Sequence, residues 1–126
     1  MVSSKDLFYS YIAQTSPGPL ELEITKASGV YLFGKNGEKY LDLISGISVS
    51  NVGHVHPKVV KAVQDQAATY MHLMVYGEYV QSPQVKLAEK ITSLLPASLD
   101  NVYFVNSGSE ANEGAMKVAK KFTGRK

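Results

Sequence analysis

The sequence contains no cysteine and no tryptophan, and none of its apolar runs approaches the length that spans a membrane. The absence of cysteine excludes a disulfide framework, thiolate chemistry and a cysteine-ligated metal site. An excess of charge is also lacking, because 13 basic and 11 acidic residues leave a net charge of +2. That balance argues against a nucleic-acid or membrane-surface partner. The first residues lack the apolar core of a signal peptide, so we expect a cytoplasmic protein.

The first part of the chain predicts one helix and a small antiparallel meander over residues 20–44. Ser3 and Asp6 have the spacing of a capping box that begins a helix. Polar and apolar residues then alternate over 20–25, as in a half-buried strand. Two further apolar runs flank Asn36-Gly37, a pair that favours a type I′ hairpin turn because both of its residues need positive φ.

The second part predicts helices with clear start and stop signals. Pro57 is placed as the first residue of a helix, and Ser82-Pro83 begins another. Gly124 is placed to cap the last helix. The buried stripe of that last helix is predicted to consist of Ala111, Ala115, Val118, Ala119 and Phe122.

One strand is expected between the last two helices. Val102–Val105 is continuously apolar, which is typical of a strand covered on both faces inside a parallel sheet. Such a strand needs neighbours, and the sequence supplies only this one. We therefore expect the chain to be the front part of a larger α/β protein, with the other strands beyond Lys126.

The turn that follows this strand is the most informative feature of the sequence. Ser107, Gly108 and Ser109 stand between the strand and the first turn of the last helix, where backbone N–H groups and the helix dipole favour an anion. The P-loop and dinucleotide-binding spacings both fail here, because neither glycine pattern is present. Two interpretations stay open on spacing alone. One is a phosphate site without a loop lysine, and the other is a simple helix cap in which Glu110 and Glu113 suit the dipole.

A resemblance favours the first interpretation. The stretch Asn106–Glu113, followed by Lys117–Lys121, resembles the signature of the class III aminotransferases, which depend on pyridoxal 5′-phosphate. The stretches 29–42 and 45–57 resemble the same family in the same order, so the similarity covers nearly the whole chain. Within the class, the sequence is most similar to the acetylornithine/ornithine/4-aminobutyrate group.

The resemblance implies a fold and a division of the chain. The fold is α/β, as the N-terminal part of a fold-type-I pyridoxal-phosphate-dependent transferase. That part comprises the small antiparallel meander, then the first helices and the first buried strand of the large domain. Residues 1–55 would belong to the small domain and residues 56–126 would begin the large cofactor-binding domain.

The resemblance also implies roles for particular residues. Ser107, Gly108 and Ser109 would bind the cofactor phosphate, with Gly108 allowing the backbone to approach closely. Ile47 would lie near the substrate, where ornithine aminotransferases carry a tyrosine, so it favours acetylornithine- or 4-aminobutyrate-like specificity. The alternative for Ile47 is an ordinary core residue. Tyr76 and Tyr79 would fall in a segment that approaches the active site in relatives.

No catalytic residue and no metal site is expected in residues 1–126. In the family, the lysine that binds the cofactor and the aspartate beside its ring nitrogen come later in the chain. His54 and His56 resemble a metal pair, but without a third ligand a structural role is the better interpretation. The same structural interpretation applies to His72.

These observations lead to two functional hypotheses. In the first, the chain is part of an aminotransferase that moves an amino group from an amino-acid donor to a 2-oxo acid. The enzyme would be a homodimer. This piece would supply the phosphate site and be inactive alone. The alternative is a truncated, non-catalytic product that binds a phosphorylated ligand or a full-length subunit.

Overall fold

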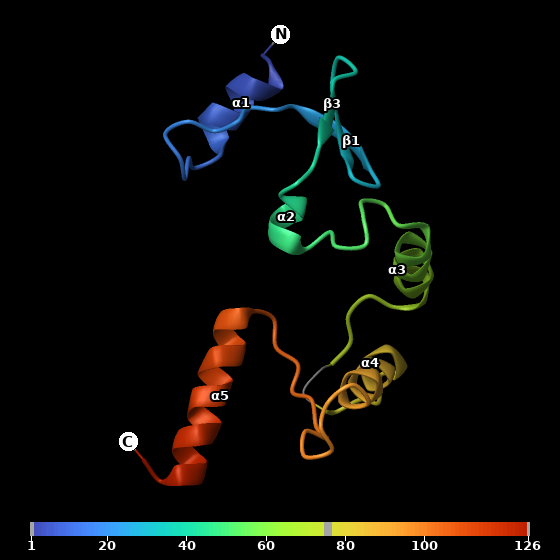
Figure 1. The fold of residues 1–126 in the computed structure, drawn as a ribbon, viewed down its shortest axis with the longest axis vertical. Helices are drawn as coiled ribbons and strands as arrows, with labels where there is room; N and C mark the ends of the chain where they lie inside the picture. The colour runs from blue at the N-terminus through green and yellow to red at the C-terminus, as the bar shows by residue number, and fades with distance from the viewer. Residues whose placement is uncertain (1, 75–76, 126) are drawn as a thin grey trace. The chain divides into compact units, whose positions relative to one another are not determined.

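The computed structural model describes residues 2–74 and 77–125, so Tyr76 lies outside the described residues. The described chain falls into two units, divided between His72 and Leu73, and each is described by itself (Figure 1). Within the described ranges, none of the helices is long and apolar enough to cross a membrane. The elements in chain order are α1 (Ser4–Tyr11), β1 (Ile24–Ser28), β2 (Tyr31–Gly34), β3 (Lys39–Leu41), α2 (Ser45–Ser48), α3 (Pro57–Thr69), α4 (Ser82–Thr92) and α5 (Gly108–Thr123).

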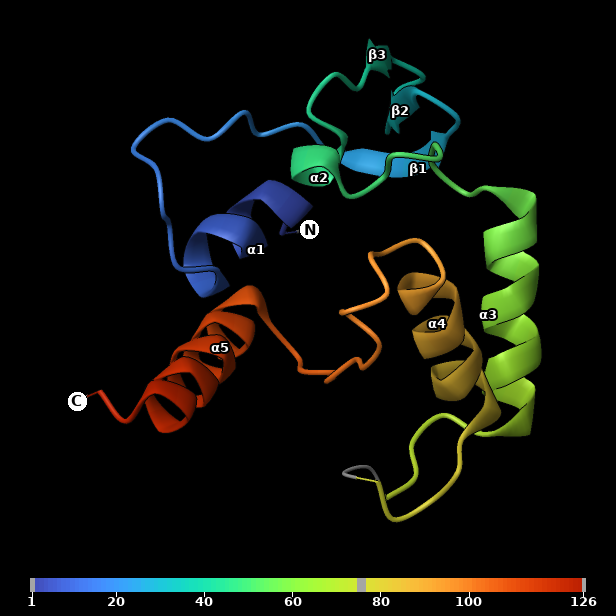
Figure 2. The same ribbon diagram turned by 60° about the horizontal axis from the view of Figure 1, so that its bottom comes forward.

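The predicted meander is confirmed as a three-stranded antiparallel sheet in the order β1-β2-β3 (Figure 2). Its first strand begins at Ile24 rather than at Leu20. Its pairing with β2 ends at Ile24, which lies opposite Gly34, and before it Glu21 leaves the extended region with a φ of 55°. Thr25 lies at an irregularity of the β1–β2 register, which shifts between Ile24 and Lys26.

The hairpin at Asn36-Gly37 forms, but the predicted turn type is wrong. Only Gly37 has positive φ, at 89°, and Asn36 does not. Gly37 N–H donates to Gly34 O at 3.2 Å, and Gly34 N–H donates to Glu38 O at 2.9 Å. These bonds match the three-residue hairpin loop with a terminal bulge, which needs left-handed backbone only at its last residue.

The predicted helix starts are confirmed. Ser3 caps α1 through a complete capping box with Asp6, and this side-chain bond from Ser3 lowers the pKa of the Asp6 carboxyl. Pro57 opens α3, and Pro83 lies in the first turn of α4. Gly124 ends α5 with a left-handed φ of 67°.

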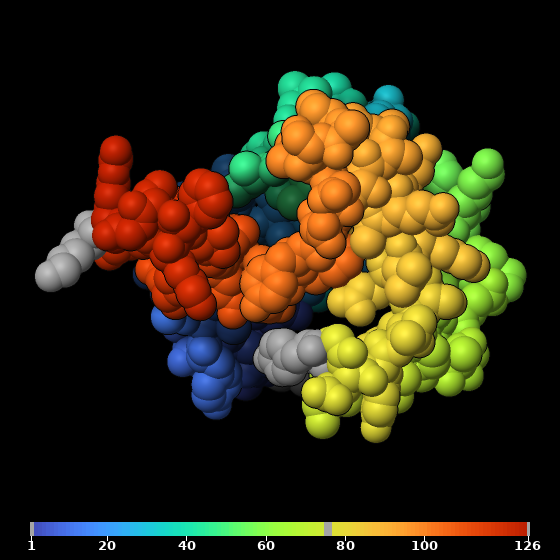
Figure 3. Space-filling model, turned by 90° about the horizontal axis from the view of Figure 1, so that it is seen from below, coloured from blue at the N-terminus to red at the C-terminus, as the bar shows by residue number. Residues whose placement is uncertain are grey.

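The predicted strand at Val102–Val105 does not form among the described residues, and its burial in a larger protein stays a prediction. These residues form no ladder, and Tyr103 is 79% exposed. A parallel strand is stable only beside other strands, and the described residues place none next to it. The apolar stripe of α5 is likewise exposed, with Phe122 at 89%, and Figure 3 shows the side chains of α5 (red) open toward the viewer. No hydrophobic side chain in the described ranges is fully buried.

Candidate functional site

The Ser107–Ser109 turn is formed by the N-terminal cap of α5. Ser107 has extended backbone, with φ −145° and ψ 160°, and its Oγ accepts a hydrogen bond from Glu110 N–H at 3.2 Å. Glu110 Oε2 in return accepts from Ser107 N–H at 3.1 Å and from Asn106 N–H at 2.8 Å. The sequence Ser-x-x-Glu therefore forms a complete capping box, which orders the backbone on both sides of Gly108.

This cap leaves two backbone donors at the start of α5. Gly108 and Ser109 are the first two residues of the helix, where an N–H group has no acceptor within the helix. The third N–H, from Glu110, is already bonded to Ser107. The helix dipole adds a partial positive charge at the same end.

The space at the Cβ position of Gly108 is open. A Cβ built on Gly108 would meet no heavy atom within 4 Å, so a ligand can approach the backbone there. The side chains of Ser107 and Ser109 are exposed. Free N–H groups, hydroxyls and open space are the chemistry that holds a phosphate group.

Two carboxylates near the turn would oppose a bound anion, but both have partners. Glu110 is turned toward Asn106 and Ser107, on the side of the turn before the helix. Glu113 pairs with Lys117, with 3.3 Å between Oε2 and Nζ. Their negative charge is thus partly compensated, and the donors of Gly108 and Ser109 stay available.

Ile47 lies in the first unit, in the short turn α2. Its φ is 58° and its ψ 57°, a left-handed conformation that is rare for a β-branched residue. The side chain is 87% exposed. The interpretation of Ile47 as a core residue is therefore wrong in this structure, and its place beside a substrate stays a prediction.

A polar cluster beside α2 was missed by the sequence reasoning. Asp42 Oδ2 accepts a hydrogen bond from His54 Nε2 at 2.7 Å, with side-chain exposures of only 9% and 20%. Asp42 Oδ1 accepts from Ser45 N–H at 2.8 Å. The Ser45 N–H and then the His54 ring lower the pKa of the Asp42 carboxyl, since both stabilise its charged form. An aspartate followed three residues later by serine was the available signal.

The histidines do not form a metal centre within the described residues. His54 uses Nε2 for the bond to Asp42, and the described residues contain no group of three or more metal-ligating side chains. His56 Nδ1, next to the start of α3, is buried and has no hydrogen-bond partner among the residues that the structure describes. Tyr79 is 57% exposed, and its place near an active site stays a prediction.

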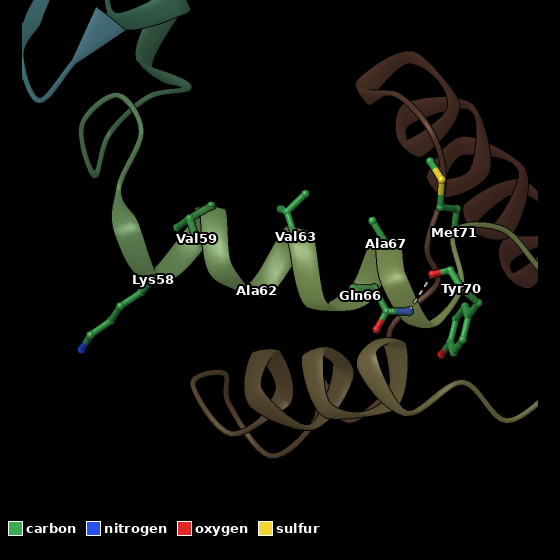
Figure 4. Close-up of a pocket in the computed structure, with 8 residues that line it drawn as sticks. All are labelled: Lys58, Val59, Ala62, Val63, Gln66, Ala67, Tyr70 and Met71. Atoms are coloured by element: carbon green, nitrogen blue, oxygen red, sulfur yellow. Dashed lines mark hydrogen bonds between the residues drawn. The ribbon is translucent and has the colours of Figure 1, made fainter.

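A groove of about 550 Å³ runs along α3 (Figure 4). Its lining is almost entirely apolar, and Gln66 Nε2 donates to the Tyr70 carbonyl at 2.9 Å. Of the described residues that line it, only Lys58 and Tyr70 carry an ionisable group, and none is a carboxylate or a histidine. The lining residues are Lys58, Val59, Ala62, Val63, Gln66, Ala67, Tyr70 and Met71.

Comparison with known proteins gives a consistent result. The family model described as Aminotransferase class-III matches residues 11–126. The acetylornithine aminotransferase of Methanocaldococcus jannaschii is 44% identical over 108 residues, covering 86% of this chain and 26% of the relative. The chain thus spans about a quarter of the length of this curated relative.

Solved structures agree with the sequence match. The acetylornithine aminotransferase of Elizabethkingia anophelis matches with a TM-score of 0.80 and 36% identity, covering 94% of this chain and 30% of that one. A taurine:2-oxoglutarate aminotransferase from Bifidobacterium kashiwanohense, solved in complex with PLP and glutamate, matches with a TM-score of 0.80 and 34% identity. It covers 94% of this chain and 27% of that one.

Proposed function

Because this chain belongs to the class III aminotransferases, we propose that it forms the cofactor-phosphate site of a pyridoxal-phosphate-dependent aminotransferase. The predicted fold class is confirmed by the solved aminotransferases that match 94% of the chain. The division into residues 1–55 of the small domain and 56–126 of the large domain stays part of the proposal.

One observation carries the proposal. The capping box of α5 orders the backbone so that the N–H groups of Gly108 and Ser109 have no acceptor within the helix, and the space at the Cβ position of Gly108 is open. A phosphate bound there would receive two backbone hydrogen bonds and the favourable end of the helix dipole. The hydroxyl of Ser109, and that of Ser107 as a donor, would complete the set.

The residues of this chain bind and orient the cofactor rather than react with it. Pyridoxal phosphate, when bound, supplies the electron-accepting ring through which an amino group is transferred. Ser107, Gly108 and Ser109 hold its phosphate and so fix the position of the ring. Ile47 provides an apolar wall on the substrate side. We assign no catalytic residue within residues 1–126, and we propose that this piece is inactive alone.

The substrate class and the assembly are proposed on the same basis. The donor is an amino acid of the acetylornithine, ornithine or 4-aminobutyrate kind, and the acceptor is a 2-oxo acid. The relatives named acetylornithine aminotransferase support this choice. Within it, isoleucine rather than tyrosine at position 47 favours an acetylornithine- or 4-aminobutyrate-like donor over ornithine. We further propose a cytoplasmic homodimer.

The phosphate site is tested with pyridoxal phosphate and with pyridoxal, which lacks the phosphate. Binding is followed by the change in cofactor absorbance, and inorganic phosphate serves as competitor. We expect the phosphorylated form to bind at least about 100-fold more tightly, since two charge-assisted hydrogen bonds contribute about 1.5–3 kcal/mol each. Equal binding of the two forms would refute the site and leave Ser107–Ser109 as a simple helix cap.

The inactivity of the piece is tested separately. Residues 1–126 alone are expected to show no amino transfer from acetylornithine to a 2-oxo acid, while the intact gene product that contains them does. Amino transfer by residues 1–126 alone would contradict the proposal. Phosphate-dependent binding without activity in the intact product would instead favour the non-catalytic alternative.

A further inference from the structure

The loop that carries Ile47 is held at both of its ends by hydrogen bonds to the Asp42 carboxylate. Asp42 Oδ1 accepts hydrogen bonds from Ile44 N–H at 3.1 Å and from Ser45 N–H at 2.8 Å, at the start of the loop. Asp42 Oδ2 accepts from His54 Nε2 at 2.7 Å, at its end. The nearly buried Asp42 side chain therefore connects the start and the end of the loop formed by residues 43–53.

Both ends of this loop also rest on the hairpin between β1 and β2. Asp42 N–H donates to Val30 O at 2.9 Å, and His54 exchanges two backbone hydrogen bonds with Gly29, at 2.7 and 3.0 Å. Gly53 passes so close that a Cβ there would lie 3.3 Å from Gly29 O. Backbone hydrogen bonds to the β1–β2 hairpin thus fix the positions of both Asp42 and His54.

Between these ends the backbone is strained. Ser45, Gly46, Ile47 and Ser48 all have positive φ, between 53° and 67°. A run of left-handed residues is unfavourable for L-amino acids, and most of all for a β-branched isoleucine. The Ile47 side chain is 87% exposed, so its own packing does not hold this conformation. Such a turn persists only where surrounding contacts impose it.

We propose that Asp42 and His54 are a positioning pair that holds the Ser45–Ser48 turn and thereby presents the Ile47 side chain to the amino-acid substrate. The substrate part of this inference rests on the proposed function. His54 closes the loop by fixing the Asp42 carboxylate, which in turn binds the N–H of Ser45. Neither side chain needs to touch the substrate.

The loop part is tested by amide hydrogen exchange in the intact gene product that contains this chain. His54→Ala is expected to speed exchange at Ile44 and Ser45 about tenfold, as for the loss of a hydrogen bond to a charged group. His54→Gln is expected to restore protection, because its side-chain amide also donates to Asp42. His72→Ala is the matched control, since His72 is exposed, and should leave exchange unchanged.

The substrate part is tested by kinetics on the same variants. His54→Ala is expected to raise KM for the amino donor more than it lowers kcat, and His54→Gln to reverse the change. Unchanged exchange in His54→Ala, or no rescue by His54→Gln, would refute the proposed role of Asp42 and His54 in holding the turn, whether or not the protein is an aminotransferase. A looser loop with an unchanged KM overturns its role toward substrate. If His54→Ala does not fold, His54→Leu, which fills the same space without a hydrogen-bond donor, is measured in its place with the same expected results.

Discussion

The N–H of Gly108 offers a direct test of the phosphate site. Gly108 is the first residue of α5, a position where proline is tolerated because the N–H has no helical acceptor. Ser107 before it is extended, with φ −145° and ψ 160°, as a residue preceding proline prefers. Gly108→Pro therefore removes one proposed phosphate donor while the helix is retained.

The expected loss follows from one charge-assisted hydrogen bond. A contribution of about 1.5–3 kcal/mol corresponds to a dissociation constant for pyridoxal phosphate that is roughly 10- to 150-fold higher. Gly108→Ala keeps the N–H but places a methyl group in the open space at the turn, so its loss should be smaller. Gly114→Ala, farther along α5 and also in open space, should not change binding.

The assay is a titration followed by cofactor absorbance, with far-UV circular dichroism to confirm that α5 is retained. Pyridoxal without phosphate provides the second comparison, because its weaker binding should not depend on Gly108. If Gly108→Pro binds pyridoxal phosphate as tightly as the unchanged protein, the backbone of this turn does not hold the phosphate.

Three further results are expected. Glu110→Gln should bind phosphate more tightly, since a like charge is removed. It should lower the free energy of unfolding by only about 0.3–1 kcal/mol, because glutamine keeps the capping box and only the favourable charge at the helix N-terminus is lost. An unchanged phosphate affinity would show that this carboxylate does not oppose the anion. Gly53→Ala should destabilise the protein by about 1–2 kcal/mol in denaturant titrations, because φ at Gly53 is +88° and Gly29 O lies close. Gly114→Ala should instead stabilise α5 by up to about 1 kcal/mol, because alanine favours a helix interior more than glycine does. A more stable Gly53→Ala than Gly114→Ala variant would contradict the backbone argument. The pKa of Asp42 is lowered from its ordinary value near 3.8, so its contribution to stability is complete above that pH and is lost as pH falls through the lower folded-state pKa. The Ser45 amide resonance, followed by NMR on acidification, should shift at a pH below that ordinary value, and a shift at or above it would refute the assignment.

Local signals in the sequence predicted most of the helices correctly. Ser3 with Asp6, Pro57 and Gly124 each act within one helical turn, so their effects depend little on the rest of the molecule. The hairpin at Asn36-Gly37 was predicted for the same reason. The predicted turn type was wrong, because the hydrogen bond between Gly34 and Glu38 belongs to a three-residue loop in which only Gly37 is left-handed.

The sequence alone therefore determined the family resemblance, the helix caps and the Ser107–Ser109 turn, all of which depend on residues close together in the chain. Only the tertiary structure decided the features that depend on distant partners. Asp42 and His54 meet because the sheet brings their backbones together, and the left-handed turn at Ile47 exists between the ends that they close. Val102–Val105 has the composition of a buried strand, but strand pairing requires hydrogen-bonding neighbours, and none lies beside it among the described residues.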